Sequence, residues 1–228
     1  MEAMDLVIFD MAGTTVVDNG QVPQAFTLAL TQAGVQVSQD ELRAVRGASK
    51  REAIRTLLAQ KTGESGAGLQ AHADQVYIAF RQALMALFEG QGVQAIPGTE
   101  GTFDQLHDLG VKIALNTGFD RTITDLILGS LGWRQGRVEA VVCGDEVPQG
   151  RPAPYLIFRC MQQVGALSVH RVANVGDTVL DLQAGYHAGV RWNVGVLSGA
   201  HSMQQLFKVP HTHLIPGVAE FNRVIKDV

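Results

Sequence analysis

The sequence predicts an α/β protein in which a parallel sheet is interrupted by an all-helical insertion. Outside residues 18–95, short apolar runs alternate with helical patterns, which is typical of a parallel sheet with helices on both faces. Within residues 18–95, no strand candidate occurs and apolar residues recur at helical spacing. We therefore expect a core of residues 1–17 plus 96–228 and a helical insertion of residues 18–95.

The first strand candidate is the apolar run Leu6–Phe9, which ends abruptly at Asp10. Asp10 would then lie at the carboxyl end of a buried strand, where open α/β sheets bind their ligands. A carboxylate there can attack phosphorus or hold a metal ion, and the Thr14 and Thr15 hydroxyls after Gly13 can bind phosphate. Taken alone, this stretch also fits an ordinary Asp that ends a strand and caps the next element.

The insertion is expected to contain four helices. Ser38 is a candidate N-cap for the second helix, and a glycine-rich break over Gly63–Gly68 precedes the fourth. The apolar residues of these segments are most simply explained as a helical core. The expected helices are Val22–Ala33, Gln39–Val45, Ser49–Lys61 and Leu69–Phe88.

After the insertion, helix and strand patterns alternate, and Gly110 is a candidate left-handed cap at the end of the first helix. Alternating units of this length predict a parallel sheet. The expected helices are Thr99–Leu109, Arg121–Leu131, Ala153–Val164 and Leu180–Ala188, and the expected strands are Lys112–Leu115, Ala140–Cys143, Arg171–Val175 and Trp192–Val196.

Polar residues follow several of these strands. Thr117 and Gly118 come after the second strand, and Arg151 precedes a helix. Asp177 and Asp181 follow the strand that ends at about residue 175. Because the carboxyl ends of parallel strands meet at one edge of the sheet, we expect these residues to face the same crevice as Asp10.

These stations, in this order, resemble the haloacid dehalogenase superfamily of phosphotransferases that use an aspartate nucleophile. The resemblance covers essentially the whole chain and implies a Rossmann-like parallel core with the insertion as a helical cap. It implies that Asp10 is the nucleophile, Thr117 the phosphate-binding hydroxyl and Arg151 the cationic station. Asp177 and Asp181 would form the acidic metal station.

Two departures make the resemblance more specific. The usual second aspartate, two residues after the nucleophile, is Ala12, and the usual lysine station is Arg151. In phosphatases the second aspartate protonates the leaving alkoxide, whereas cleavage of a carbon–phosphorus bond produces no alkoxide. The sequence thus resembles the phosphonoacetaldehyde hydrolase family, through DMAGTTV at 10–16, GRPAPY at 150–155 and VGDTVLD at 175–181.

That family carries a lysine early in its cap, at the end of a Gly-x-x-Lys segment, and Lys50 after Gly47 matches it. The resemblance implies that Lys50 forms a Schiff base with a substrate aldehyde, whose iminium accepts the electrons of the broken bond. The positive potential of a helix N-terminus would lower the pKa of such an amine. An ordinary solvated lysine at a helix start is the alternative for Lys50 alone.

Other positions depart from the family near the expected substrate. Ala53 replaces a histidine three residues after the lysine, Gly20 replaces a cysteine, and Arg46 replaces a methionine. Arg46 could bind a carboxylate or a second anion, which would place the chain in a phosphonatase-like sister group with a different substrate. Arg46, Gly47, Gly118, Thr14 and Thr15 are our candidate substrate-binding residues.

The expected metal ion is Mg²⁺. Carboxylate oxygens of Asp10 and Asp177, the backbone carbonyl of Ala12 and waters form the hard oxygen ligand set that Mg²⁺ prefers. Asp181 belongs to the same acidic station and would orient a ligand water or Arg151.

Composition limits the partners. The net charge of −4 and the scattered Lys and Arg residues argue against nucleic acid, and no apolar stretch approaches the length of a membrane span. Cys143 and Cys160 have no metal-site spacing and indicate reduced thiols in a cytoplasmic compartment. The resemblance adds a possible homodimer that forms through the cap.

Three functions stay open. We favour carbon–phosphorus hydrolysis of phosphonoacetaldehyde or a similar phosphonate, through Lys50 and Asp10. The second is hydrolysis of a small phosphate monoester, as by a phosphoglycolate phosphatase, which must explain the missing acid at Ala12. The third is a non-catalytic phospho-receiver module, but such domains are far shorter than 228 residues and lack a helical insertion.

Overall fold

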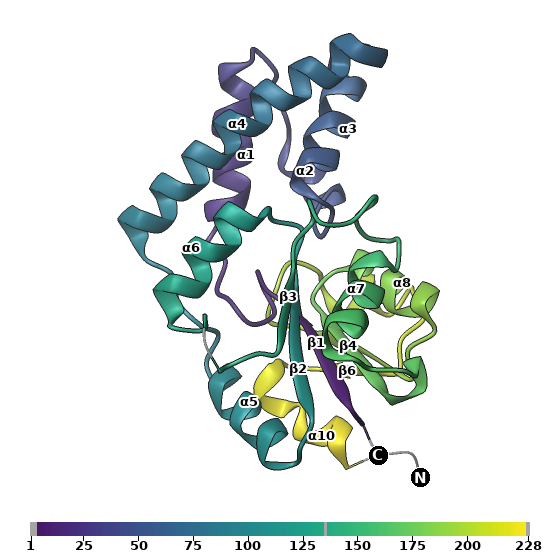
Figure 1. Ribbon diagram of the computed structural model, residues 1–228. Helices are drawn as coiled ribbons and strands as arrows, with labels where there is room; N and C mark the ends of the chain where they lie inside the picture. The colour runs from purple at the N-terminus through teal and green to yellow at the C-terminus, as the bar shows by residue number, and fades with distance from the viewer. Residues whose placement is uncertain (1–3, 135, 227–228) are drawn as a thin grey trace.

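The computed structural model describes residues 4–134 and 136–226. Its core is a six-stranded sheet in the order β3-β2-β1-β4-β5-β6, and every pair of neighbours is parallel. The predicted α/β class with a parallel sheet is therefore confirmed (Figure 1). The strands are β1 (Leu6–Asp10), β2 (Lys112–Asn116), β3 (Ala140–Val142), β4 (Val172–Gly176), β5 (Trp192–Val196) and β6 (His213–Ile215).

Helices cover both faces of this sheet because β1 is apolar on both sides. Leu6 and Ile8 are fully buried in the cluster formed with α7 and α8. Phe9 points to the opposite face, where its ring centroid lies 5.5 Å from that of Phe103 and 5.6 Å from that of Phe221. The core helices are α5 (Thr99–Asp108), α6 (Arg121–Leu131), α7 (Tyr155–Val164), α8 (Val179–Ala188), α9 (Met203–Leu206) and α10 (Asn222–Ile225), with short 3₁₀ turns at Val169–Arg171 and Val218–Glu220.

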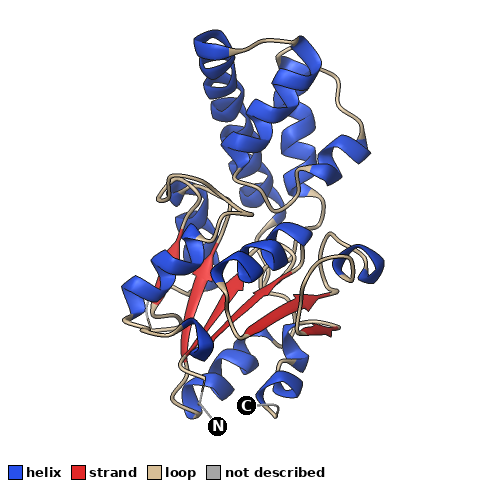
Figure 2. Cartoon of the chain, turned by 90° about the vertical axis from the view of Figure 1, so that its right-hand side faces the viewer, coloured by secondary structure: helices blue, strands red, loops and turns tan. Residues whose placement is uncertain are grey.

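The insertion is all-helical, as predicted, and lies over the carboxyl edge of the sheet (Figures 1 and 2). The long helix α4 packs on α1 and α3, and Phe26 and Phe80 meet with their ring centroids 4.6 Å apart. We call the helices α1–α4 the cap. They are α1 (Gln21–Gln32), α2 (Gln39–Ala44), α3 (Lys50–Thr62) and α4 (Gly66–Gln91).

The two connections between core and cap run side by side. The Val17 amide donates to the Gln94 carbonyl at 2.9 Å, and the Ile96 amide donates to the Thr15 carbonyl at 2.9 Å. These paired segments lie next to the expected domain boundaries at residues 17/18 and 95/96. The division into two domains at these boundaries stays a prediction. Among the described residues, no helix combines the length and the apolar character needed to cross a membrane.

Some element boundaries differ from the prediction. Gly63 ends α3 with a φ of 72°, but the expected break does not continue to Gly68, because α4 already begins at Gly66. Each glycine costs a helix about 1 kcal/mol relative to alanine, and the packing of the 26-residue helix α4 on α1 and α3 offsets that cost. The strand β6 and the short helices α9 and α10 were missed because three or four residues show no measurable periodicity.

Candidate active site

Nine of the residues singled out from the sequence line one cavity between the core and the cap. Its volume of about 20 Å³ is close to the space that one water needs, so the cap lies closed on the core. A substrate of several heavy atoms therefore needs the cap to move. The nine residues are Asp10, Ala12, Arg46, Gly47, Lys50, Thr117, Gly118, Arg151 and Asp177.

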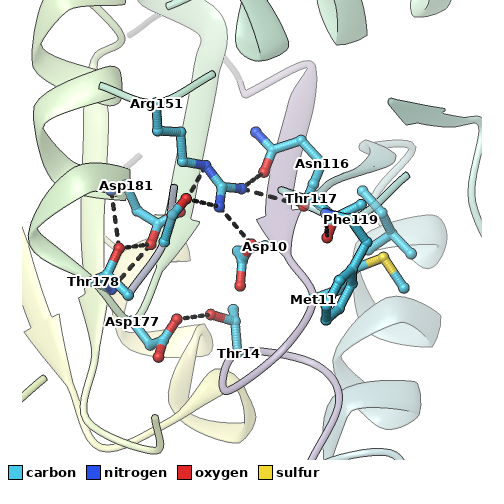
Figure 3. Close-up of polar contacts among 12 residues, drawn as sticks. Asp10, Met11, Thr14, Asn116, Thr117, Phe119, Arg151, Asp177, Thr178 and Asp181 are labelled. Atoms are coloured by element: carbon cyan, nitrogen blue, oxygen red, sulfur yellow. Dashed lines mark hydrogen bonds and ion pairs between the residues drawn. The ribbon is translucent and has the colours of Figure 1, made fainter. Parts of the chain in front are cut away.

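Arg151 links the acidic residues of the cavity. Its Nη1 lies 2.7 Å from an Asp10 oxygen and its Nε lies 2.9 Å from an Asp181 oxygen, while the side chain is only 3% exposed. Figure 3 shows the guanidinium between these carboxylates, with Nη2 directed to Asn116. A planar fork of donors suits this arrangement, since each nitrogen meets a different partner. Asn116 was missed, although its polar side chain at the end of an apolar strand was a signal.

Asp181 holds Arg151 in place, and both of its carboxylate oxygens already have partners. One oxygen receives Arg151, and the other accepts the Thr178 amide at 3.0 Å and the Thr178 hydroxyl. The bond from the Thr178 amide, together with the bond that the Asp181 amide donates to the Thr178 hydroxyl at 3.3 Å, forms the capping box of α8. Both oxygens of Asp181 are thus engaged, and this geometry fits the expected role of Asp181 in orienting Arg151; its place in the acidic metal station stays a prediction.

Asp10 and Asp177 are buried carboxylates at the ends of neighbouring strands. Burial raises the pKa of Asp10 to about 6, against the opposing effect of Arg151. Burial, together with the negative charge of Asp10, raises the pKa of Asp177 to about 8. Asp177 accepts the Ala200 amide at 2.6 Å and the Thr14 hydroxyl at 3.4 Å. Among the described residues, no Lys, Arg or His forms an ion pair with Asp177.

This donor set fits a divalent cation. Asp10 and Asp177 are hard oxygen donors on one cavity, and Ala12 beside them can add its backbone carbonyl. Arg151 pairs with Asp10 but not with Asp177, so a cation could bind between the two carboxylates and favour their ionised forms. Within residues 4–134 and 136–226, no three His, Cys, Asp or Glu side chains gather closely enough to hold a metal alone. An ion would thus need backbone and water ligands, which Mg²⁺ commonly keeps.

The three candidate hydroxyls differ in their positions. The Thr117 oxygen accepts the Phe119 amide at 3.1 Å, so the hydroxyl proton is left to donate into the cavity. Thr14 donates to Asp177, and Thr15 donates to the Asp10 carbonyl at 2.9 Å. The Thr14 and Thr15 hydroxyls therefore have partners within the protein in this closed structure, and their contact with substrate stays a prediction.

Lys50 is the first residue of α3 and is buried, with 9% of its surface exposed. Its Nζ lies 4.9 Å from the centroid of the Phe119 ring and 3.4 Å from the Ala48 carbonyl oxygen. Burial lowers the pKa of Lys50 to about 8, Asp10 opposes this shift, and nearby Arg46 and Arg151 add to it. A solvated lysine does not have these surroundings. Phe119 was missed because an aromatic residue after a strand carries no specific signal.

Gly47 and Gly118 permit the cap and the core to touch. A Cβ at Gly118 would lie 2.5 Å from the Ala48 carbonyl oxygen, and a Cβ at Gly47, whose φ is 85°, would lie 2.2 Å from the Thr178 hydroxyl. The Lys50 amide also donates to the Gly118 carbonyl at 3.1 Å. These glycines line the cavity, and their clearest effect is to let Lys50 approach.

Arg46 lies at the boundary between this cavity and a larger one of about 410 Å³. Its guanidinium pairs with Asp18, which also accepts the backbone amides of Gly20 and Val22. Asp18 was missed in the sequence, where an acidic residue in a connecting segment is unremarkable. The Arg46 guanidinium is thus paired with Asp18 in the closed structure, and its expected contact with a substrate anion stays a prediction.

Comparison with known proteins assigns the family. The family model of the haloacid dehalogenase-like hydrolases matches residues 4–189. A phosphonoacetaldehyde hydrolase of Bacteroides fragilis is 30% identical over 232 aligned positions, covering 98% of this chain and 87% of the relative. A phosphonoacetaldehyde hydrolase of Bacillus cereus is 29% identical over 88% of this chain and 78% of its own length.

Solved structures agree on the fold. A phosphonoacetaldehyde hydrolase-like protein from Oleispira antarctica has a TM-score of 0.87 at 24% identity, covering 99% of this chain and 92% of that one. A structure from Lactobacillus delbrueckii that is described as a phosphoglycolate phosphatase has a TM-score of 0.79 at 18% identity, covering 98% of this chain and 99% of that one. At these identities the likeness shows the shared core and cap arrangement alone.

Proposed function

The chain belongs to the haloacid dehalogenase-like hydrolases, and we propose that it cleaves the carbon–phosphorus bond of phosphonoacetaldehyde or a similar phosphonate. In this proposal Lys50 forms a Schiff base with the substrate aldehyde and Asp10 takes the phosphoryl group. The relatives at about 30% identity, named phosphonoacetaldehyde hydrolases, support the substrate class.

One observation carries the proposal: a buried amine with a lowered pKa shares a cavity with the buried carboxylate of Asp10. A lysine pKa of about 8 leaves part of Lys50 unprotonated near neutral pH, and only the free amine attacks a carbonyl. Phe119 covers the amine on the core side and keeps water from it. An electrostatic role alone would not require this desolvation.

The chemistry balances in two halves. The Lys50 amine adds to the aldehyde and expels water, which leaves an iminium bonded to the carbon that carries phosphorus. An oxygen of Asp10 then attacks phosphorus, the carbon–phosphorus bond breaks, and its electron pair moves into the iminium to form an enamine. Protonation of the enamine carbon and hydrolysis of the resulting iminium release acetaldehyde and restore Lys50. Hydrolysis of the aspartyl phosphate releases phosphate and restores Asp10.

The surrounding residues have separate parts in this scheme. Arg151 orients the Asp10 carboxylate and favours its ionised form, and Thr117 donates its hydroxyl proton to a phosphonate oxygen. Mg²⁺ held by Asp10, Asp177 and the Ala12 carbonyl would neutralise the charge between the carboxylates and the phosphonate. Arg46 is proposed to contact a further anionic group of the substrate.

Phosphate monoester hydrolysis is the competing function, and the aspartate that usually protonates its leaving group is replaced by Ala12 in this chain. Ala12 offers no proton, and Asp10 and Asp177 are the carboxylates among the described residues that line the cavity. Asp10 is the proposed nucleophile and Asp177 the proposed metal ligand, so neither is placed to protonate a leaving alkoxide.

A direct comparison of substrates tests the proposed function. With Mg²⁺, we expect phosphonoacetaldehyde to give phosphate and acetaldehyde in equal amounts, and phosphoglycolate to give phosphate far more slowly. The reverse preference would replace this proposal by the phosphatase. A phosphonate aldehyde with an added carboxylate, compared in wild type and Arg46→Met, tests Arg46: an unchanged KM in the variant would remove it from the substrate site.

Two further proposals come from the resemblance: a homodimer that forms through the cap, and a cytoplasmic location. The exposed apolar side chains of Leu28 on α1 and Ile78 on α4 support the first. Sedimentation of wild type and a Leu28→Glu, Ile78→Glu variant tests it, and a wild type that sediments as a monomer would contradict it. Fractionation of native cells tests the second.

A further inference from the structure

The loop between β2 and α6 is held by the cap from two sides. On one side, the Lys50 amide donates to the Gly118 carbonyl at 3.1 Å, and Lys50 Nζ lies over the Phe119 ring. On the other side, the Tyr77 hydroxyl of α4 donates to Asp120 Oδ2 at 2.7 Å. The loop also contains Thr117, so the cap contacts the segment that presents the phosphate-binding hydroxyl.

Asp120 joins the core to the cap. Its Oδ1 accepts the Ile123 amide at 2.9 Å and caps the N-terminus of α6. Its Oδ2 accepts Tyr77 and lies 2.8 Å from Arg81 Nε. Asp120 and Tyr77 are 7% and 5% exposed, so these contacts are made largely out of water. Burial and the bond to Asp120 raise the pKa of Tyr77, which therefore stays a hydrogen-bond donor.

A third contact connects Tyr77 to the residue that follows Lys50 in α3. The guanidinium carbon of Arg51 lies 4.8 Å from the centroid of the Tyr77 ring, and Arg51 also pairs with Asp74 on α4. Arg51 directly follows Lys50 in α3. The path thus runs from Lys50 through Arg51 to Tyr77, then through Asp120 to Phe119, whose ring lies under the Lys50 amine.

We infer that Tyr77 is a positioning residue: through Asp120 it fixes Phe119 against Lys50 and holds the amine inside the closed cavity. The inference rests on the proposed function only in taking Lys50 as the reactive amine. Loss of the Tyr77 hydroxyl leaves Arg81 as the cap partner of Asp120, and Arg81 is one-third exposed. The closed arrangement is then less populated and water reaches the amine.

Competitive labelling of Lys50 measures its surroundings without substrate. The Mg²⁺-loaded protein is treated with trace acetic anhydride from pH 6 to 11, and acetylation of Lys50 is quantified by mass spectrometry. The groups facing Lys50 are Asp10 on β1, Asp18 before α1, Arg46 before α3 and Arg151 before α7. All four are kept in Tyr77→Phe, so a change in labelling reports the cap.

In Tyr77→Phe we expect the labelling midpoint of Lys50 to rise by about one pH unit toward that of a solvated lysine, and the limiting rate at high pH to increase. Asp120→Asn keeps an N-cap acceptor for α6 and should change both quantities in the same direction. Tyr186→Phe, at a tyrosine that is 61% exposed, is the matched control and should label like wild type.

The catalytic readout separates positioning from loss of folding. Tyr77→Phe and Asp120→Asn should keep a cooperative thermal transition and lower kcat by about tenfold or more, since small displacements of a reacting group slow catalysis steeply. Wild-type labelling midpoint and limiting rate in both folded variants would overturn the inference, even if carbon–phosphorus cleavage is proved. If labelling of Lys50 changes in the variants but the wild-type protein hydrolyses only phosphate monoesters, the positioning role of Tyr77 is supported and the proposed carbon–phosphorus cleavage is contradicted. If Tyr77→Phe does not fold, Asp120→Asn decides on the same criteria.

Discussion

Arg151 Nη1 lies 2.7 Å from an oxygen of Asp10, and the pair is almost completely shielded from solvent. Burial alone favours the protonated carboxyl of Asp10, and Arg151 offsets that effect only in part. The proposed nucleophile is therefore held in position by a cation that is itself fixed by Asp181.

Replacement of Asp10 by asparagine removes the nucleophile and one proposed metal ligand without changing core volume. We expect Asp10→Asn to lower kcat by about four orders of magnitude and to leave the circular dichroism spectrum unchanged. Turnover at the wild-type rate in this variant would contradict the aspartyl-phosphate mechanism.

Lysine cannot replace Arg151, although it keeps the charge. A single ammonium group cannot reach Asp10, Asp181 and Asn116 together, whereas the three guanidinium nitrogens do. We expect Arg151→Lys to lower kcat/KM by about 10²-fold and to lower the thermal midpoint. The matched control is Arg159→Lys, at an exposed arginine of α7 that contacts Gln162, and equal effects in the two variants would contradict this account.

Activity should require a divalent cation, since Asp10, Asp177 and a phosphonate dianion repel one another at close range. Treatment with excess chelator should abolish phosphate release, and added Mg²⁺ should restore it. Full activity in excess chelator would show that the acidic pair does not hold a metal ion.

The buried Lys50 should make stability depend on pH. Its pKa is about 8 in the folded protein and 10.5 in the unfolded chain, so between these values the unfolded state binds more protons and stability rises with pH. Below pH 8 the desolvated amine costs about 3 kcal/mol. Lys50→Met should therefore be more stable than wild type at pH 7, and the difference in the free energy of unfolding should shrink toward pH 10.5. A difference that is the same at both pH values would contradict the lowered pKa.

Most of the core was predictable from the sequence because short apolar runs alternate with helical patterns along the chain. Asp10, Thr117, Arg151 and Asp177 could be identified because the strand ends of a parallel sheet meet at one edge, and the structure brings these four residues to one cavity. The partners of these residues could not be predicted in the same way. Asn116, Phe119 and Asp120 act through tertiary contacts with Arg151, Lys50 and Tyr77, and no periodicity records such contacts.

The cap was the less predictable part. Its helices follow from 3.6-residue periodicity, but the closed position of Lys50 depends on Gly47 and Gly118 letting two backbones approach. Helix α4 begins at Gly66 and not at the expected Leu69. Packing on α1 and α3 outweighs the local cost of Gly66 and Gly68, and this packing is also a tertiary effect.

Borohydride trapping tests the central claim, the Schiff base at Lys50, most directly. Wild type treated with phosphonoacetaldehyde and borohydride should lose activity and carry a reduced adduct that peptide mass mapping assigns to Lys50. Lys50→Arg keeps the positive charge but cannot form the adduct, so it should lose carbon–phosphorus cleavage and remain unmodified at this position. An unmodified, fully active wild type after this treatment, together with an active Lys50→Arg variant, would contradict the account.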